Sequence, residues 1–296
     1  MDRLDAMAVF VSVVRHGSFS AASRELRVPL PTVSRKVSEL ESHLGTKLLV
    51  RSTRKLLLTE AGEAFVGASK RILEEVAEAE RAASGEYRAP RGELTLTAPL
   101  VFGRLHVVPV VTEFLRNHAD VDVRLMLTDR SLNLIDDQLD MGVRIGAVPE
   151  HLVAIRLGQV RSVVCATPAY LKEHGTPKTP SDLAAHRCVS FSGFPGADSW
   201  TFRDGEVAHI RSRLSVNTAE AAIDGALAGL GLTRVLSYQV ENALRAGKLV
   251  AVLKRHEPVP VPVNLIYLQE MRVTAKVRAF IDLAVPKLQA RLRPLS

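Results

Sequence analysis

The sequence predicts an α/β protein with an all-α N-terminal part. In residues 1–60, apolar positions recur at helical spacing and are interrupted by proline and glycine. Residues 61–86 contain no proline and are rich in alanine and glutamate, which predicts one long helix. From Glu93 onward, β-branched runs alternate with helical stretches, which is typical of an α/β domain with mostly parallel sheets. We therefore expect domains at 1–60, 61–89 and 90–296.

The balance of charges favours a polyanionic partner. The 296 residues carry a formal net charge of +7. Aromatic residues make up only 5% of the chain, which argues against stacking on single-stranded bases. The positive charge concentrates in residues 27–55, where seven basic residues stand against two acidic ones. This local excess predicts contact with double-stranded DNA.

The sequence predicts neither export nor a membrane span. The N-terminus has acidic residues early and lacks a small-residue cleavage site after a long apolar run. No stretch reaches the roughly 18 apolar residues that a membrane helix needs. We expect a cytoplasmic protein with no membrane partner.

The two cysteines, Cys165 and Cys188, show neither metal-ligand spacing nor a disulfide framework. The sequence therefore predicts no metal site and no cofactor. A redox switch is one alternative, since Arg187 adjoins Cys188. Both cysteines lie in apolar strand patterns, which favours small buried hydrophobic side chains instead.

A helix-turn-helix pattern spans residues 18–45. Ser18 is an N-cap candidate for the first helix, and Pro29 and Pro31 end that helix and begin the next. Gly45 is placed to end the second helix in a left-handed conformation. Positions 33, 37, 40 and 44 give this second helix an apolar face.

The opposite face of the second helix carries side chains that can reach base edges and phosphates. Arginine can bond guanine bidentately, and serine or threonine can bond either a base or a phosphate. An ordinary solvated basic face is the alternative interpretation. The candidate DNA-binding residues on this helix are Leu30, Pro31, Thr32, Ser34, Arg35 and Lys36.

A basic hairpin and a long helix follow. Apolar runs flank residues 51–55, which predicts a two-stranded wing whose Arg51 and Arg54 meet the DNA backbone or the minor groove. In the next helix, apolar residues step by three and four, which predicts a seam that pairs two chains. The seam residues are Phe65, Ala68, Ile72, Val76, Ala79 and Ala83.

The remaining chain alternates strands with helices. Helices are expected at 107–115, from Pro168 onward, at 219–228 and at about 274–291, with a short helix at 132–136 and a small meander around 200–210. The expected strands cover 94–98, 121–127, 139–145, 162–167, 187–192, 213–217, 249–253 and 263–268.

These features resemble the LysR-type transcriptional regulators. The resemblance rests on AVFVSVVRHGSFSAASREL and VSRKVSELESHLGTKLLVRSTRKLLLTEAG, and extends more loosely through GELTLTAP, PAYLKEHGTPKTPSDLAAHRCV and GLGLTRVLSYQV. It implies a winged helix-turn-helix, a long linker helix and a two-lobed sensor domain like periplasmic binding proteins. The lobes are expected at about 90–160 plus 268–296, and at 161–267.

The resemblance also implies partners and residue roles. A homodimer or dimer of dimers would bind operator DNA under the control of a small-molecule effector held between the lobes, with RNA polymerase as a further candidate partner. The family's base-reading positions fall on Leu30, Pro31, Ser34 and Arg35, and its wing arginines on Arg51 and Arg54. Members often have glutamine where this chain has Leu30, which can instead touch a thymine methyl group.

Ligands of two-lobed α/β domains bind at the carboxyl ends of strands and at helix starts. The candidate effector-binding residues are Thr97, Pro99, Leu100, Val101, Arg144, Phe191, Asn217 and Thr218. They predict a modest, partly hydrophobic metabolite, with a carboxylate as one option.

Each candidate also has a purely structural alternative. Asn217 and Thr218 can be helix caps. Arg144 can form a surface ion pair with Asp140, and Phe191 can belong to the core.

An enzyme and a transport binding protein are the two alternative classes of function. The sequence contains no hydrolase, zinc-protease, P-loop or dinucleotide-binding motif, so we expect no enzyme and no catalytic residues. A transport binding protein would share the sensor fold. The basic N-terminal domain and the predicted lack of export argue against it.

Overall fold

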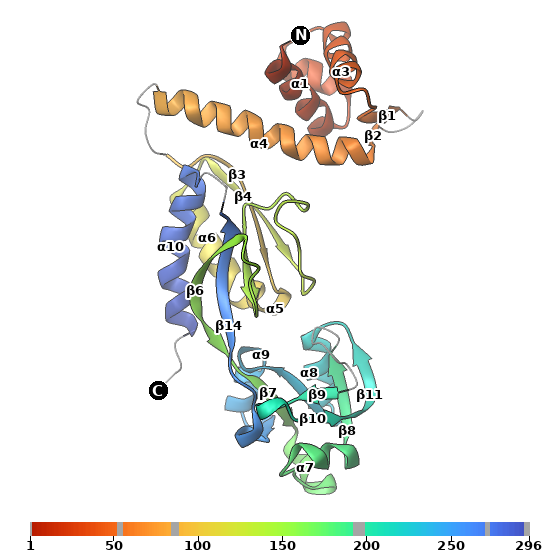
Figure 1. Cartoon of the computed structure of the whole chain (residues 1–296), viewed down its shortest axis with the longest axis vertical. Coiled ribbons are helices and arrows are strands. Elements are labelled where there is room, and N and C mark those ends of the chain that lie inside the picture. The colour runs from red at the N-terminus through yellow and green to blue at the C-terminus, as the bar shows by residue number, and fades with distance from the viewer. Residues whose placement is uncertain (1, 52–55, 84–88, 192–198, 270–272, 293–296) are drawn as a thin grey trace. The chain divides into compact units, whose positions relative to one another are not determined.

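The computed structural model describes residues 2–51, 56–83, 89–191, 199–269 and 273–292, and divides into two compact units. The first unit is Met1–Gly92 and the second is Glu93–Ser296 (Figure 1). Within the first unit, the long helix packs against the first helix, so these contacts do not separate residues 61–89 as a domain of their own.

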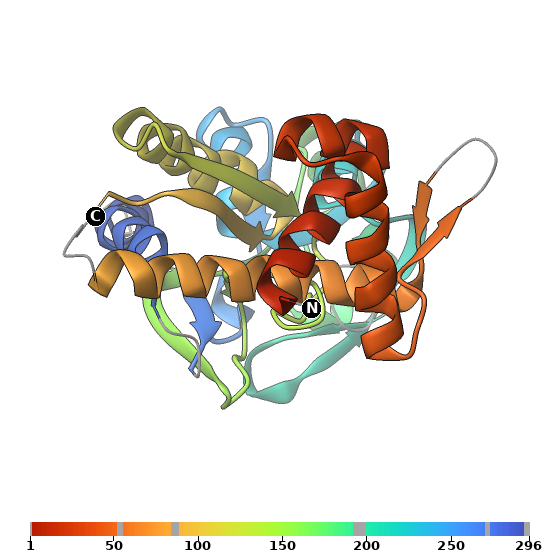
Figure 2. The same cartoon turned by 90° about the horizontal axis from the view of Figure 1, so that it is seen from above.

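Three helices and a hairpin form most of the first unit. They are α1 (Arg3–His16), α2 (Phe19–Leu26), α3 (Leu30–Leu44), β1 (Leu49–Arg51) and β2 (Leu56–Leu58). The Ser18 side chain accepts a hydrogen bond from the backbone of Ala21 and caps α2, and Gly45 ends α3 in the left-handed region, as the sequence predicts. Phe10, Leu40 and Leu48 lie fully buried in the core beneath α3. The antiparallel hairpin extends from this helical body (Figures 1 and 2).

The long helix α4 (Glu60–Ala83) begins against the hairpin. Gly62 is required there, because a Cβ atom would lie 2.1 Å from the carbonyl oxygen of Leu48. Phe65 packs against Phe10 with ring centroids 5.9 Å apart, so this half-buried member of the predicted seam also contacts the core of its own unit. Ile72 lies further along the helix and stays 38% exposed.

The second unit contains two lobes, each built on a five-stranded sheet. In the first lobe the strand order is β4-β3-β5-β14-β6, and α6 and α10 pack together through an edge-to-face contact of Phe114 and Phe280. The elements are β3 (Gly92–Ala98), α5 (Leu100–Phe102), the π-helix Gly103–Val107, α6 (Val108–Asn117), β4 (Val121–Leu127), β5 (Met141–Ile145), β6 (Leu152–Val160), β14 (Val261–Leu268) and α10 (Ala275–Leu292).

The second lobe has the strand order β11-β8-β12-β7-β13. Gly231 allows β12 to approach β8, because a Cβ atom there would lie 2.1 Å from the carbonyl oxygen of Arg187. The elements are β7 (Ser162–Ala166), α7 (Pro168–His174), β8 (Arg187–Phe191), β9 (Ser199–Thr201), β10 (Val207–His209), β11 (Arg211–Val216), α8 (Ala219–Leu227), β12 (Leu232–Leu236), α9 (Ser237–Arg245), β13 (Val250–Val252) and the 3-10 turns Pro180–Ala185, Arg203–Gly205 and Lys254–His256.

Several expectations for this unit are wrong in detail. Both sheets are mixed rather than mostly parallel, because β14 runs antiparallel to β5 and β6, and β7 runs antiparallel to β12 and β13. Strand β14 lies between β5 and β6 and so belongs to the first lobe, although residues 161–267 were expected in the second. Strand β6 was not predicted, and turns occupy the expected helix at 132–136.

Candidate functional site

The first candidate site is the exposed face at the start of α3. Proline at the second position of this helix suits a helix start, and Val33, Val37 and Leu40 turn into the core. Leu30 is 42% exposed, which leaves its methyl groups available for contact. Pro31 and Arg35 are exposed, while Thr32 and Ser34 are half-buried. The structure thus places these five predicted residues along one accessible helix start.

The two basic residues of this face differ in their partners. Arg35 is exposed and forms an ion pair with Glu39 one turn away, with 3.5 Å between Nη1 and Oε1. Such solvent-exposed pairs contribute little, so Arg35 can exchange Glu39 for another partner. Lys36 is more buried and bonds Asp5 in the first turn of α1. Lys36 therefore ties α3 to α1, in addition to the contact with DNA expected from the sequence.

A buried carboxylate fixes the hairpin relative to α3. The Oε1 atom of Glu41 accepts hydrogen bonds from the backbone N–H groups of Leu48 and Leu49, at 3.0 and 3.2 Å, and its Oε2 accepts one from Lys47 Nζ at 2.6 Å. Burial alone would raise the pKa of Glu41, but these donors outweigh it and hold the pKa below the ordinary value. Glu41 was not singled out from the sequence, although a charge on the apolar side of a helix is a usable signal.

Of the two expected wing residues, the structure describes the backbone of Arg51 only. The backbone of Arg51 ends β1, opposite Leu56 of β2. Arg54, along with the Arg51 side chain, lies outside the described residues.

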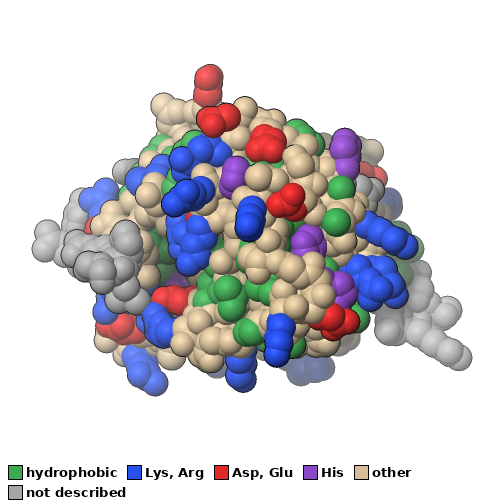
Figure 3. Space-filling model, turned by 90° about the horizontal axis from the view of Figure 1, so that it is seen from below, with side chains coloured by type: hydrophobic (Ala, Val, Ile, Leu, Met, Phe, Trp, Pro, Cys, Tyr) green, Lys and Arg blue, Asp and Glu red, His purple; other side chains and the backbone are tan. Residues whose placement is uncertain are grey.

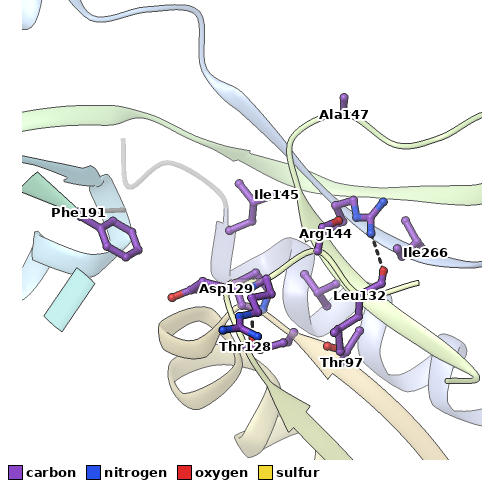
Figure 4. A pocket seen from close by; sticks show the side chains of 14 residues that line it. Thr97, Thr128, Asp129, Leu132, Arg144, Ile145, Ala147, Phe191 and Ile266 are labelled. Atoms are coloured by element: carbon purple, nitrogen blue, oxygen red, sulfur yellow. Dashed lines mark hydrogen bonds between the residues drawn. The ribbon is translucent and has the colours of Figure 1, made fainter. Parts of the chain in front are cut away.

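The second candidate site is a pocket of about 240 Å³ in the second unit. The first lobe supplies the ends of β3 and β5, the loop after β4, and one residue of β14, while Phe191 enters from the second lobe (Figure 4). Phe191 lies opposite Asp129 and Ile145 in this view. The lining residues are Thr97, Ala98, Pro99, Thr128, Asp129, Arg130, Ser131, Leu132, Val143, Arg144, Ile145, Ala147, Phe191 and Ile266.

Four of the eight predicted effector residues line this pocket: Thr97, Pro99, Arg144 and Phe191. Arg144 does not pair with Asp140; its Nη2 donates to the carbonyl oxygen of Leu132 at 3.0 Å (Figure 4). Phe191 serves both roles that the sequence left open, since it lines the pocket and is buried in the core of the second lobe.

The other four predicted residues lie elsewhere. Val101 is buried and Leu100 is half-buried, and both pack against the hydrophobic core of the second lobe. The Oγ1 atom of Thr218 accepts from the backbone of Ala221 and caps α8, and Asn217 beside it is exposed and does not line the pocket. The helix-cap alternative thus describes Thr218.

Asp129 holds the first-lobe wall of the pocket together. Its Oδ1 accepts a hydrogen bond of 3.1 Å from the backbone N–H of Leu100, at the start of α5. Burial raises the pKa of Asp129, the Leu100 bond lowers it, and the negative charge of Glu220 on α8 raises it further, with a net upward shift. Glu220 is itself bonded to Arg104 across the two lobes, with 2.6 Å between Oε1 and Nη2.

Neither a metal site nor a membrane span is supported by the described residues. No cluster of three or more metal-binding side chains is found among them, and no helix of theirs is long and apolar enough to cross a membrane. Burial raises the pKa of both Cys165 and Cys188 to about 12, which keeps both thiols protonated and unreactive near neutral pH. On the face seen in Figure 3, Lys and Arg side chains are interspersed with Asp, Glu and His rather than gathered into one patch.

Comparison with known proteins decides between the classes of function. The model of bacterial lysR-family regulatory helix-turn-helix proteins matches residues 4–63, and the model of the LysR substrate binding domain matches residues 88–289. This chain belongs to the LysR family of transcriptional regulators. The predicted fold class and regulatory function are confirmed: an N-terminal helix-turn-helix domain binds DNA, a C-terminal domain binds an effector, and the protein is a regulator rather than an enzyme.

Individual LysR proteins match over nearly the whole chain. The probable HTH-type transcriptional regulator LtrA of Klebsiella pneumoniae is 36% identical, over 98% of this chain and 97% of that protein. The structure of CrgA, a LysR-type regulator from Neisseria meningitidis, is 31% identical, with a TM-score of 0.61 over 96% of this chain and 98% of that chain. LysG from Corynebacterium glutamicum, solved with a bound arginine effector, has the same fold at 24% identity, with a TM-score of 0.62 over 99% of this chain and all of that chain.

Proposed function

We propose that this LysR-family regulator reads its operator with the N-terminal turns of α3 in the major groove. The observation that carries the proposal is the division of that helix: its apolar face is buried, while Leu30, Pro31 and Arg35 are exposed at its start. Arg35 would bond a guanine, and Leu30 would contact a thymine methyl group. Thr32 and Ser34 would bond bases or phosphates, and Lys36 would hold the helix in position through Asp5.

The hairpin would contribute contacts that do not depend on sequence. Arg51 and Arg54 would bind phosphates or the adjacent minor groove, since Arg51 ends β1 and Arg54 lies in the sequence between β1 and β2. Glu41 supports this role, because it fixes β1 relative to α3 through three hydrogen bonds.

A second copy of the chain would pair along α4. The support is the exposure of Ile72 on a helix of 24 residues, where an apolar side chain left in water costs free energy that pairing recovers. Pairing would give two copies of α3, suited to half-sites about one helical turn or a multiple apart. Dimers of these dimers, contact with RNA polymerase at the promoter, and action in the cytoplasm where operators lie are further parts of the proposal.

The effector would bind in the pocket lined by Thr97, Pro99, Arg144 and Phe191. Residues of both lobes line it, so a ligand there can favour one arrangement of the lobes over another. Regulation follows only if the ligand's affinity differs between DNA-binding states of the assembly.

DNA binding itself provides the direct test. The full chain is titrated into labelled DNA from upstream of its own gene, with a shuffled sequence of equal length and composition as the control. We expect protection of two half-sites and preference for the native sequence by about 1,000-fold or more. Equal binding of native and shuffled DNA at moderate salt would contradict sequence-specific recognition.

A further inference from the structure

The charged side chains of the pocket do not balance one another. Among its fourteen lining residues are two arginines, Arg130 and Arg144, and one carboxylate, Asp129. With Asp129 ionised, the charged groups of the lining sum to +1. Since most of the other lining residues are apolar, a ligand that enters the pocket meets this positive charge at short range.

The Arg130 guanidinium has no partner among the described residues. Neither a hydrogen bond nor an ion pair of its side chain is present, although its backbone N–H bonds Thr128 Oγ1 at 3.2 Å. By contrast, Arg144 donates one hydrogen bond to the carbonyl oxygen of Leu132 (Figure 4). Arg130 therefore offers its whole planar fork of N–H donors, a geometry that matches a carboxylate.

Hydroxyl groups beside Arg130 can complete an anion site. Thr128 Oγ1 accepts a hydrogen bond from the backbone N–H of Arg130, and the hydroxyl proton of Thr128 remains available for donation. The Ser131 hydroxyl has no protein partner among the described residues. One loop after β4 thus supplies two hydroxyl donors and a guanidinium that no described residue pairs with.

Asp129 is less suited to receive a ligand cation. One of its oxygens already accepts a hydrogen bond of 3.1 Å from the backbone N–H of Leu100, a donor at the start of α5 that has no partner within the helix. Burial opposes its ionisation, which weakens its attraction for a positive group. The pocket consequently favours a negative ligand over a positive one.

The rest of the pocket lining indicates the polarity and size of the ligand. Pro99, Ile145 and Phe191 line the pocket with apolar surface from both lobes. A volume of about 240 Å³ corresponds to roughly eight water molecules at ~30 Å³ each, so the ligand is a small metabolite.

We propose that the effector is a small organic monocarboxylate with a compact apolar body, its carboxylate bound by Arg130 with help from Ser131 and Thr128, and its body held between Pro99, Ile145 and Phe191. This inference rests on the proposed effector pocket and adds the ligand's chemical class. It also makes Arg130, which the sequence did not indicate, the residue that selects for negative charge.

The test measures binding of four probes to the full chain by calorimetry. They are cyclohexanecarboxylate, its neutral amide, cyclohexylmethylammonium and acetate. We expect cyclohexanecarboxylate to bind about tenfold or more tightly than the amide, because a charge-assisted bidentate contact is lost in the amide. Acetate, which lacks the apolar body, should also bind about tenfold more weakly. Equal or tighter binding of the amide or the ammonium probe, or no binding of the carboxylate, would overturn the proposal.

Three variants locate the effect. Arg130→Gln should weaken the carboxylate by about tenfold and leave the amide unchanged, while Arg130→Lys should recover part of the loss. Arg124→Gln removes the same charge from an exposed position on β4 outside the pocket lining and should change neither. An Arg130→Gln variant that still prefers the acid would overturn the role of Arg130.

Ala147→Trp separates this proposal from the pocket assignment. Ala147 is exposed and lines the pocket, so a large side chain there fills the space without disturbing the core. If the amide or the ammonium binds best and Ala147→Trp blocks it, the pocket stands and the carboxylate inference fails. If carboxylate binding is unaffected by Ala147→Trp, the ligand binds elsewhere and both fail.

Discussion

In the N-terminal unit, the candidate DNA-contacting residues of α3 lie within one stretch of seven residues, whereas the lining of the C-terminal pocket ranges from Thr97 to Ile266. The first site is a helix surface whose orientation is set by caps, prolines and a buried apolar face. The second exists only where strands distant in sequence meet in a mixed sheet and a residue of the other lobe approaches. The two sites are therefore separable: substitutions in α3 should affect DNA whether or not ligand is present, and substitutions in the pocket should affect the response to ligand.

A substitution on α4 that prevents dimer formation is expected to have the largest effect on operator binding. Ile72→Glu would place a charge in the proposed α4 contact, where pairing would bury it without a partner. We expect loss of the dimer in analytical ultracentrifugation and a decrease in operator affinity of about 100-fold or more, because two half-sites are no longer bound together.

Arg71→Glu is the matched control for Ile72→Glu. Arg71 is an exposed neighbour on the same helix and is not part of the apolar series. The Arg71→Glu variant should remain dimeric at micromolar concentration. If Ile72→Glu keeps the wild-type mass, pairing does not use this face of α4.

A substitution in the C-terminal pocket tests whether the response to an effector depends on this site. Phe191→Arg would insert a charge and extra volume into the pocket and should abolish the change in operator affinity that an effector causes, while operator affinity without ligand stays within about twofold of wild type. Both are read from gel shifts with an effector identified on the wild-type protein. Phe191 is also buried in the second-lobe core, so Ala147→Trp serves as a second variant with less risk to folding. An undiminished response in both variants would place the effector elsewhere.

A smaller effect concerns the stability of the N-terminal unit. Glu41→Gln removes the charge that three donors share, and its amide N–H₂ would face Lys47 or the backbone donors. We expect a decrease of about 1–3 kcal/mol in the free energy of unfolding at pH 7. Glu39→Gln, on the same helix, is the control and should change stability by less than about 0.5 kcal/mol, since its ion pair is exposed.

The same residue gives this unit a pH dependence of known sign. Because the pKa of Glu41 is lowered in the folded protein, the carboxylate stabilises the fold at neutral pH, and that contribution is lost as the pH falls below about 4.5 toward the folded-state pKa. Denaturant unfolding at pH 7, 4.5 and 3 should show wild type and Glu41→Gln converging in acid. A constant difference across this range would mean that Glu41 acts through its shape rather than its charge.

The two units also differ in how far their structure follows from the sequence. Ser18, Pro31 and Gly45 act within a few residues of their own position, so the helices and hairpin of the first 60 residues are predictable from local pattern. In the second unit, β14 carries an ordinary strand pattern, and nothing in that pattern tells which of two sheets it joins. Strand β14 was expected in the second lobe, whereas it pairs with β5 and β6 in the first-lobe sheet, where Ile266 lines the pocket.

The pocket loop after β4 shows both a missed signal and a physical reason for an error. Thr97 was found because it ends a strand, and Thr128 follows the neighbouring strand by the same rule. The residues beyond it were expected to form a helix at 132–136. Instead, the segment forms turns. The side chains of Asp137 and Asn133 accept hydrogen bonds from the backbone N–H groups of Asn133 and Ile135, and such local bonds compete with a regular helix.

Base reading by α3 is tested by comparing Arg35→Ala with wild type on the native operator and on a set of operators changed one base pair at a time. If α3 reads bases, Arg35→Ala should lose about 1–3 kcal/mol of specific binding and lose base preference at one position in each half-site, with the rest of the preference retained. Arg116→Ala, an exposed arginine of α6 in the other unit, makes the same change in net charge and should leave the whole profile unaltered. If Arg35→Ala binds the native operator as tightly as wild type with the same base preferences, α3 does not read DNA through its N-terminal turns.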